Sequence, residues 1–265
     1  GDLRVVTRVR GRLGSGRLQT GDLMLAFRLL RHSILQVTGN LGAALTLSVM
    51  PLLLAALGIG IGLAARQAFM GGNPPGIAVA AVMLAIVAIF ALAFVTLAAP
   101  WHRFVLLNER PRVLRPIGRP ELRYVGASIR IFLIMLLVGI PVVLLSSALI
   151  IALDGNLGAM LVINLLIGFA LAVLGLRLGT GLAGAATGAA RPLTTGWRAT
   201  ADAFGTLAVL SLLTQVLGLV LNLVAGLPGA AGIVAALLVT WFSALLSLSI
   251  ITTLWGHFVE GRALR

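Results

Sequence analysis

Cysteine and lysine are absent from this chain of 265 residues, and charged residues of either sign are few. Without cysteine the chain forms no disulfide, holds no iron–sulfur cluster through thiolates and has no thiol nucleophile. Only seven residues are acidic, and 10% are charged, whereas 60% are hydrophobic. The mean hydropathy of +1.11 lies far above the range of soluble globular proteins. The composition therefore predicts an integral membrane protein.

Six apolar runs are long enough to cross a bilayer as helices. They are Leu41–Ala64, Gly76–Ala99, Ile131–Leu153, Ala159–Leu176, Phe204–Gly226 and Gly232–Trp255. A helix of about 24 residues is roughly 36 Å long, which exceeds the hydrocarbon core of about 30 Å. The fourth run is the shortest, and its helix could continue past Arg177 into a Gly/Ala-rich stretch. The pattern predicts an all-α polytopic membrane protein with six transmembrane helices in three hairpins.

Two segments precede the first span. Residues 1–20 hold five arginines and four glycines without an apolar period, which predicts a mobile basic tail and no signal peptide. Residues 21–40 predict an amphipathic helix in the headgroup plane, or alternatively an extension of the first span. Its apolar stripe is Leu23, Phe27, Leu30, Ile34 and Val37. The six-span domain then covers residues 41–258, and residues 259–265 form a cytoplasmic tail.

The twenty basic residues are all arginine, and they are distributed very unequally between the two sides of the predicted membrane domain. Nineteen fall on the N-terminal tail, the inner loops and the C-terminus, and Arg66 alone falls on the outer side. The positive-inside rule therefore places both termini in the cytoplasm. A net charge of +13 would suit nucleic acid in a soluble protein. Beside apolar runs, the nearer partners are anionic phospholipids, so we predict no nucleic-acid partner.

The segment from Trp101 to Arg130 connects the second and third spans and carries seven arginines against two acids, Glu109 and Glu121. A loop this basic beside two spans is expected to meet headgroup phosphates. The predicted lipid headgroup-binding residues are Arg103, Arg110, Arg112, Arg115, Arg119, Arg123 and Arg130.

Three amides inside the spans, Asn164, Gln215 and Asn222, predict an intramembrane polar seam. Polar side chains in hydrocarbon seek partners, so these amides could hold the hairpins together. Alternatively they could line a wet cavity and touch a substrate. Small residues on the same face as Asn164 predict close approach by another helix. They are Gly168, Ala172, Gly175 and Gly179.

Several residues resemble parts of known sites without the context that those sites require. Gly179–Gly184 fits G-x-G-x-x-G, but a dinucleotide fingerprint follows a strand, and a membrane span precedes it here. His102, His257 and Glu260 could share a metal only if the hairpins bring them together, and no HExxH pattern supports this. We therefore predict no metal and no cofactor. An interfacial aromatic belt is predicted from Trp101, Tyr124, Trp197 and Trp255.

Parts of the chain repeat. WHRFV at 101–105 matches WGHFV at 255–259, which indicates hairpins related by an internal repeat. FRLLRHSILQVTGNLGAAL, WHRFVLLNERP, RPLT followed by a tryptophan, and TTLWGHFVEGRAL resemble an uncharacterised family of alphaproteobacterial six-span inner-membrane proteins. More distantly, the layout is similar to the membrane-anchor domain of glycerophosphodiester phosphodiesterases. The resemblance implies a fold and a bacterial inner membrane, and no catalytic residues.

The predicted spans contain no acidic residue, although ion-coupled carriers commonly need ionisable groups inside the membrane. We therefore expect a non-enzymatic accessory or scaffold protein whose basic cytoplasmic face binds anionic lipid and possibly a larger membrane complex. The alternative is a transporter or lipid-handling protein with a cavity between the hairpins. An intramembrane enzyme is the third choice.

Overall fold

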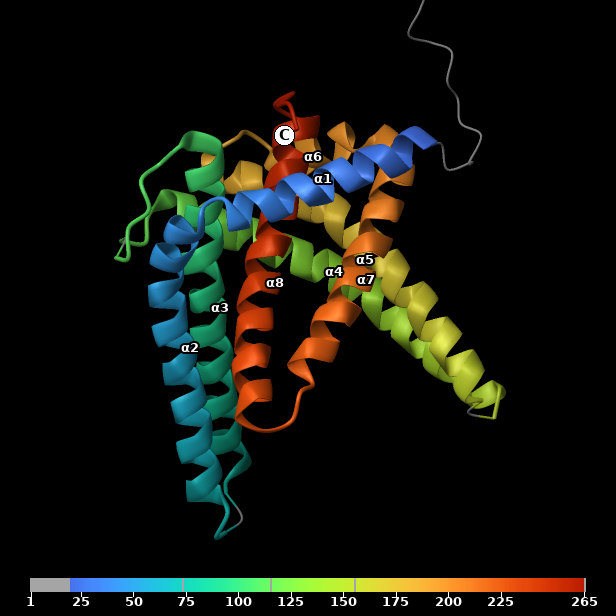
Figure 1. Ribbon diagram of the computed structural model, residues 1–265. Coiled ribbons are helices and arrows are strands. Elements are labelled where there is room, and N and C mark those ends of the chain that lie inside the picture. The colour runs from blue at the N-terminus through green and yellow to red at the C-terminus, as the bar shows by residue number, and fades with distance from the viewer. Residues whose placement is uncertain (1–19, 73, 115, 155, 265) are drawn as a thin grey trace, which may run out of the picture.

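The computed structural model describes residues 20–72, 74–114, 116–154 and 156–264, and helices dominate this part of the chain (Figure 1). They are α1 (Thr20–Thr38), α2 (Leu41–Phe69), α3 (Gly76–Leu107), α4 (Arg119–Ala152), α5 (Leu157–Thr187), α6 (Pro192–Ala199), the 3-10 turn η2 (Ala201–Ala203), α7 (Phe204–Ala225) and α8 (Gly229–Phe258). Six of the described helices, all except α1 and α6, are long and apolar enough to cross a membrane. The predicted all-α class and six spans are confirmed. Residues 1–19 of the predicted tail lie outside the described residues.

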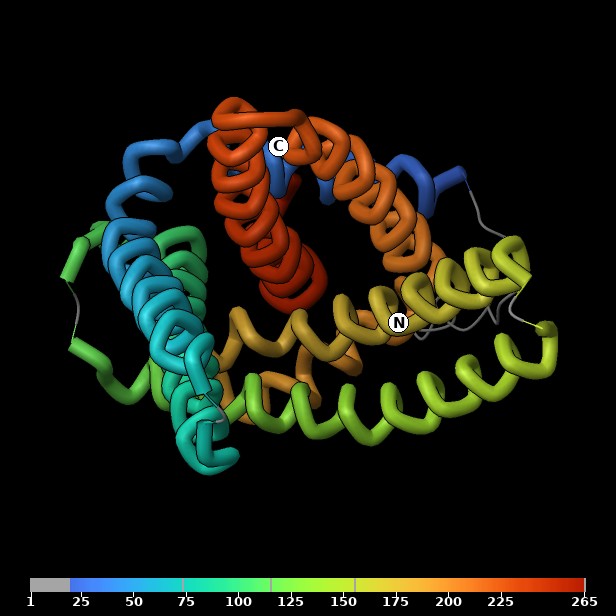
Figure 2. The backbone as a smooth tube through the Cα atoms, turned by 90° about the horizontal axis from the view of Figure 1, so that it is seen from below, coloured from blue at the N-terminus to red at the C-terminus, as the bar shows by residue number. Residues whose placement is uncertain are grey.

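The six long helices form three hairpins, each made of neighbours in the chain. α2 lies against α3, α4 against α5, and α7 against α8. Figure 2, seen from below, shows the three pairs placed around the molecule. Short connections force each pair to run antiparallel, which is the geometry expected for helices joined by a few residues.

The hairpins converge at one end of the molecule and separate towards the other (Figure 1). Buried side chains gather at the converging end. In α5, residues 178–186 are all buried, whereas most of residues 157–172 are exposed or half-buried. α5 lies centrally at this end, since it contacts α3, α4, α6, α7 and α8. Its glycines and alanines allow that density of neighbours because small side chains let helix backbones approach closely.

Three helices extend well beyond the spans predicted for them. α3 continues eight residues past Ala99 to Leu107, and α4 begins at Arg119, twelve residues before Ile131. At the start of α4, Glu121 accepts a hydrogen bond from the Gly118 N–H at 2.9 Å, and Pro120 stands in the first turn. Both features favour a helix start. α5 continues past Arg177 to Thr187, which was the longer of the two possibilities for the fourth span.

α1 is a separate helix that crosses the converging ends of α7 and α8 (Figure 1). It does not extend the first span, because its helix ends at Thr38 and α2 begins at Leu41 in another direction. The predicted apolar stripe is only partly right. Leu23 and Phe27 are 46% and 49% exposed, whereas the buried residues are Ala26, Leu29, Ser33 and Val37, of which Val37 alone belongs to that stripe. Ala26 and Ser33 have small side chains, which let this face of α1 pack closely on protein.

Candidate functional site

The connection between α3 and α4, residues 108–118, mixes exposed arginines with exposed apolar side chains, and we call it the basic loop. It leaves α3 at Asn108, whose φ of 54° is left-handed. Arg110 and Arg112 are exposed, and Leu114 beside them is 75% exposed. In Figure 1 this loop stands out beside the α2–α3 hairpin, at the converging end.

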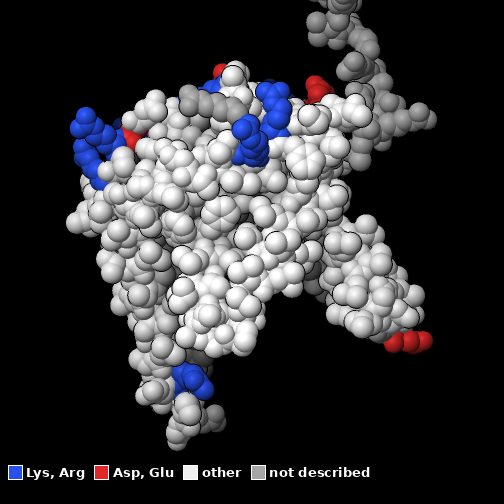
Figure 3. All heavy atoms as spheres, viewed as in Figure 1, with Lys and Arg blue, Asp and Glu red and all other residues white. Residues whose placement is uncertain are grey.

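Basic groups gather at the converging end, and the space-filling view shows blue atoms over the basic loop and near α1 (Figure 3). Of the other predicted headgroup residues, Arg119, Arg123 and Arg130 are exposed on α4. Arg115 lies outside the described residues. Arg66 is in the last turn of α2, at the far end of the first hairpin.

Arg103 differs from the other predicted headgroup residues because its side chain is occupied within the protein. Its Nε donates to Glu109 Oε2 at 3.0 Å, and its Nη2 forms an ion pair with Glu109 Oε1. Its Nη1 donates to the carbonyl of Ala186 at 2.9 Å, in the last turn of α5. The last carbonyls of a helix lack partners within the helix and favour a cation. Arg103 and Glu109, which we call the α3 clamp, therefore hold α5 to α3.

A second pair repeats this arrangement after α8. Arg262 Nε donates to Glu260 Oε2 at 2.6 Å, and Arg262 Nη2 donates to the carbonyl of Leu106 at 2.7 Å. Glu260 also accepts a hydrogen bond from Trp255 Nε1 at 2.8 Å. Arg262 and Glu260, the α8 clamp, hold the C-terminal segment over the end of α3. The segments that contain the two tryptophan motifs thus each supply a Glu–Arg pair that binds another helix end. Arg103 lies within the first motif, and Arg262 follows the second.

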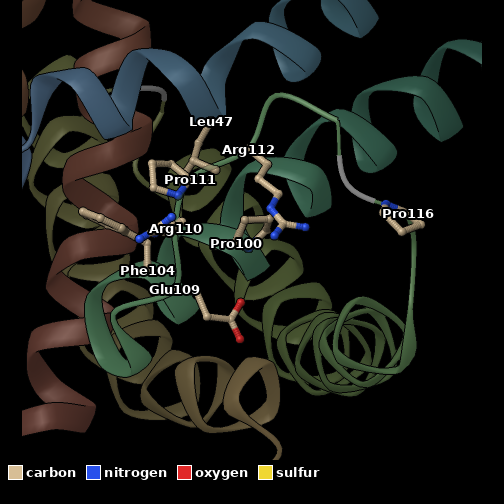
Figure 4. Close-up of a pocket in the computed structure, with 8 residues that line it drawn as sticks. All are labelled: Leu47, Pro100, Phe104, Glu109, Arg110, Pro111, Arg112 and Pro116. Carbon is tan, nitrogen blue, oxygen red and sulfur yellow. The ribbon is translucent and has the colours of Figure 1, made fainter.

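A pocket of about 350 Å³ lies where the basic loop meets α2 and α3. Figure 4 shows the side chain of Arg112 extending from the loop towards Pro100, while Glu109 points to the opposite side. The lining residues are Leu47, Pro100, Phe104, Glu109, Arg110, Pro111, Arg112 and Pro116. The pocket therefore combines guanidinium groups with an apolar wall from two spans.

Comparisons with family models, with curated proteins and with solved structures find no match to this chain. The resemblance described above rests on its quoted motifs alone. The arguments for function therefore depend on the residues and their surroundings.

A larger hollow of about 590 Å³ lies between α1, the ends of α3 and α8, and the C-terminal segment. His32 and His257 line it, whereas His102 is buried nearby. The Nδ1 of His257 lies 3.2 Å from the carbonyl of Arg262, and Glu260 serves the α8 clamp. Within the described ranges, no three His, Cys, Asp or Glu side chains come together as a metal site would require.

Three of the four aromatic residues assigned to an interfacial belt are buried in protein, so that prediction was wrong for Trp101, Tyr124 and Trp255. Trp101 Nε1 donates to Ser249 Oγ at 3.0 Å, which joins α3 to α8. Trp197 is 38% exposed, and the Arg177 guanidinium lies 3.8 Å from its ring centre. The aromatic residues serve helix packing more than lipid contact.

His102 makes a similar bond between α3 and α8. Thr252 Oγ1 donates to its own helix at the Leu248 carbonyl, 2.7 Å away. Its oxygen therefore accepts from His102 Nδ1, also at 2.7 Å, which places the imidazole proton on Nδ1. Trp241 Nε1 donates to Ser48 Oγ at 2.8 Å and joins α8 to α2. Aromatic N–H groups and hydroxyl oxygens thus form hydrogen bonds between spans. The partners lie far apart in the sequence, so the sequence alone does not predict these pairs.

The three amides of the predicted polar seam lie at the protein surface or half-buried on their own helices. Asn164 donates to the Met160 carbonyl and Asn222 to the Gly218 carbonyl, both at 2.8 Å within their own helices. Both asparagines are exposed on the surface of the protein. Gln215 is half-buried on α7, and its Nε2 lies 3.4 Å from two oxygens of Ser211. A role in joining the hairpins therefore stays a prediction.

On α5, the closest contacts with other elements occur beyond the predicted small-residue face. A side chain added at Gly175 would meet nothing within 4 Å, whereas one at Gly181 would lie 2.6 Å from the Cα of Leu193. At Gly184 it would overlap the indole ring of Trp255. The G-x-G-x-x-G pattern therefore has a packing role, since it admits α6 and a tryptophan against α5.

Proposed function

We propose that this chain is a non-enzymatic accessory or scaffold protein of the bacterial inner membrane. Its arginine-rich inner face binds anionic phospholipid, and the same face docks a larger membrane complex. The observation that carries the proposal is the mixture of exposed arginines with exposed Val113 and Leu114 on the basic loop. Guanidinium groups attract phosphates while apolar side chains enter the headgroup boundary, so the mixture suits a membrane surface.

The outer face of α1 has the same character. Arg28 and Arg31 are exposed there, and so are Met24 and Phe27. The opposite face of α1 packs on α7 and α8, which leaves these residues available for other contacts. α1 is also anchored, because Thr206 Oγ1 donates to Asp22 at 2.9 Å and Ser33 Oγ donates to Thr253 at 3.0 Å. A fixed helix with a basic and apolar outer face supports docking of lipid and of a partner complex.

Charge reversal on the basic face tests the lipid part of the proposal. The triple variant R112E/R119E/R123E, purified from native membranes in mild detergent, should lose most of its phosphatidylglycerol and cardiolipin by mass spectrometry. Each arginine near an anionic surface contributes about 1 kcal/mol, so reversing three should weaken retention by several kcal/mol. Retention by the wild type should also fall as salt rises, because mobile ions screen the attraction.

Arg66 provides the control, because it is exposed at the far end of the first hairpin. R66E should retain as much anionic lipid as the wild type. Equal lipid content in the triple variant and the wild type would show that the basic face does not hold lipid. The scaffold part requires a partner, so a protein that purifies repeatedly from native membranes without a stoichiometric companion would argue against it.

A second function, lipid handling between the hairpins, is favoured by the separation of the hairpins away from the basic end (Figure 1). The most apolar stretch of α4 has none of its residues buried within the protein, and that of α5 has 6%. This leaves room for lipid beside those helices. A reconstituted protein that moves labelled phospholipid between leaflets faster than protein-free vesicles would favour this function over the scaffold.

A further inference from the structure

The pocket under the basic loop has a net positive charge. Glu109 lines it, but the α3 clamp neutralises that carboxylate with Arg103. Arg110 and Arg112 line it too, and in the described part of the chain no carboxylate forms an ion pair with either. Two guanidinium groups beside one pocket favour an anion, because Glu109, the acid among its described lining residues, is already neutralised. Guanidinium groups bind phosphate oxygens well because several N–H donors fit them at once.

The apolar wall of the pocket lies about two helical turns in from the ends of α2 and α3. Pro100 stands seven residues before the end of α3 at Leu107, and Leu47 stands six after the start of α2 at Leu41. Both positions are therefore roughly 10 Å along the helix axes from their ends. Pro100 also directly follows the apolar run that ends at Ala99. With the ends of α2 and α3 at the membrane surface, a headgroup layer about 5–8 Å thick would place this wall at the top of the hydrocarbon.

We propose that this pocket is a discrete site for one anionic glycerophospholipid. Arg110 and Arg112 hold its phosphate, and the glycerol and the first acyl carbons lie on Leu47, Pro100 and Phe104. The inference rests on the proposed lipid-binding function and adds a single site to it. The volume of about 350 Å³ falls within the roughly 300–1,000 Å³ of small-molecule pockets. A free phosphate would use the arginines and leave the apolar wall uncovered, so the observations favour the lipid.

Two double variants with equal loss of charge test the site. R110Q/R112Q removes the pocket arginines, and R191Q/R198Q removes two exposed arginines beside and within α6 that do not line it. Each protein is stripped of lipid by detergent washing, checked for a monodisperse elution profile, and titrated with dioleoyl phosphatidylglycerol. Native mass spectrometry then counts the bound lipids and measures their affinity. Inorganic phosphate at millimolar concentration is added in a parallel series.

The wild type should bind one lipid much more tightly than any further lipid. R110Q/R112Q should lose about thirtyfold in that affinity, which is what two arginine–phosphate attractions at a membrane surface contribute. R191Q/R198Q should lose less than about threefold, because salt screens charges outside the pocket. Inorganic phosphate should not displace the lipid.

The remaining outcomes distinguish failure of the discrete pocket site from failure of the proposed lipid-binding function. Equal losses in both double variants would leave the lipid-binding face intact and overturn the discrete site. No tight lipid on the wild type would overturn both. Displacement by inorganic phosphate would show that the pocket takes a soluble phosphate and would overturn the lipid assignment.

Discussion

At the scale of single residues, the converging end depends on a few glycines that leave room for a neighbouring helix or its side chain. Gly184 on α5 faces the indole ring of Trp255, which is 3% exposed. That ring cannot easily move, because its Nε1 donates to Glu260 and Glu260 is paired with Arg262. The glycine, the tryptophan and the α8 clamp therefore act as one packing unit that ties α8 to α5.

Replacing Gly184 with alanine should lower the stability of the protein in detergent. The added methyl group would overlap the Trp255 ring, and overpacking of this kind costs roughly 1–3 kcal/mol. G175A is the matched control on the same helix, since a side chain there meets nothing within 4 Å. Alanine favours helix by up to about 1 kcal/mol over glycine, so G175A should be neutral or stabilising. Equal melting temperatures for the two variants would show that the α5–Trp255 contact is looser than described.

The sequence predicts that arginines gather at one end, but it does not show which of them face outward. Arg103 and Arg112 look alike in a basic segment, and only the fold places Arg103 against the carbonyl of Ala186, 83 residues away. Arg262 was not among the predicted site residues, although a glutamate follows both tryptophan motifs, Glu109 after the first and Glu260 after the second. That repeat is the one sequence signal that could have suggested the two clamps. Burial of Trp101 and Tyr124 also depends on distant helices.

At the scale of elements, hydropathy predicts where a helix crosses hydrocarbon and says little about where it ends. The apolar run of α3 stops at Ala99, and that of α4 starts at Ile131. Both helices nevertheless continue through flanking segments that carry arginines. Their ends are set by local features such as the Glu121 cap on Gly118. Periodicity likewise predicts that α1 is amphipathic but misplaces its buried face, because α1 packs on α7 and α8 through Ala26, Leu29 and Ser33.

The exposed amides of α5 and α7 provide a test at this scale. The double variant N164L/N222L should keep its thermal stability in detergent within about 1 kcal/mol, or gain slightly. Each amide now bonds only to a carbonyl of its own helix, and removing a polar group from hydrocarbon offsets the loss of a weak bond. S249A is the contrasting variant, because it removes the acceptor of the buried Trp101 indole and should destabilise by roughly 1–3 kcal/mol. A clear loss of stability in N164L/N222L would mean that the amides bind a second chain or another span.

At the scale of the whole molecule, charge and packing coincide at one end. Figure 3 shows most of the blue atoms where the hairpins converge, and Arg66 lies at the other end. The two clamps place arginines on helix C-termini at that same end, where the partial negative charge of the helix dipole favours them. The convergence of α3, α5 and α8 therefore stabilises positive charge on one face. The positive-inside rule predicts that this face points in one direction, towards the cytoplasm.

That direction is testable because the chain contains no cysteine, so a single introduced thiol is the only site for a maleimide. Cysteines at Gly72, in the α2–α3 turn, and at Ala230, at the start of α8, should react with a membrane-impermeant maleimide on intact bacteria. Cysteines at Gly118, before α4, and at Ala190, between α5 and α6, should react only after the membrane is permeabilised. All four positions lie at helix ends outside the buried core, and Gly72 has open space around it. Turning the protein over would expose Arg110, Arg112 and the α4 arginines to the periplasm, against the charge bias that sets membrane topology. Labelling of G118C on intact cells would therefore reject the cytoplasmic placement of the basic face, and with it the proposed contact with inner-leaflet lipid.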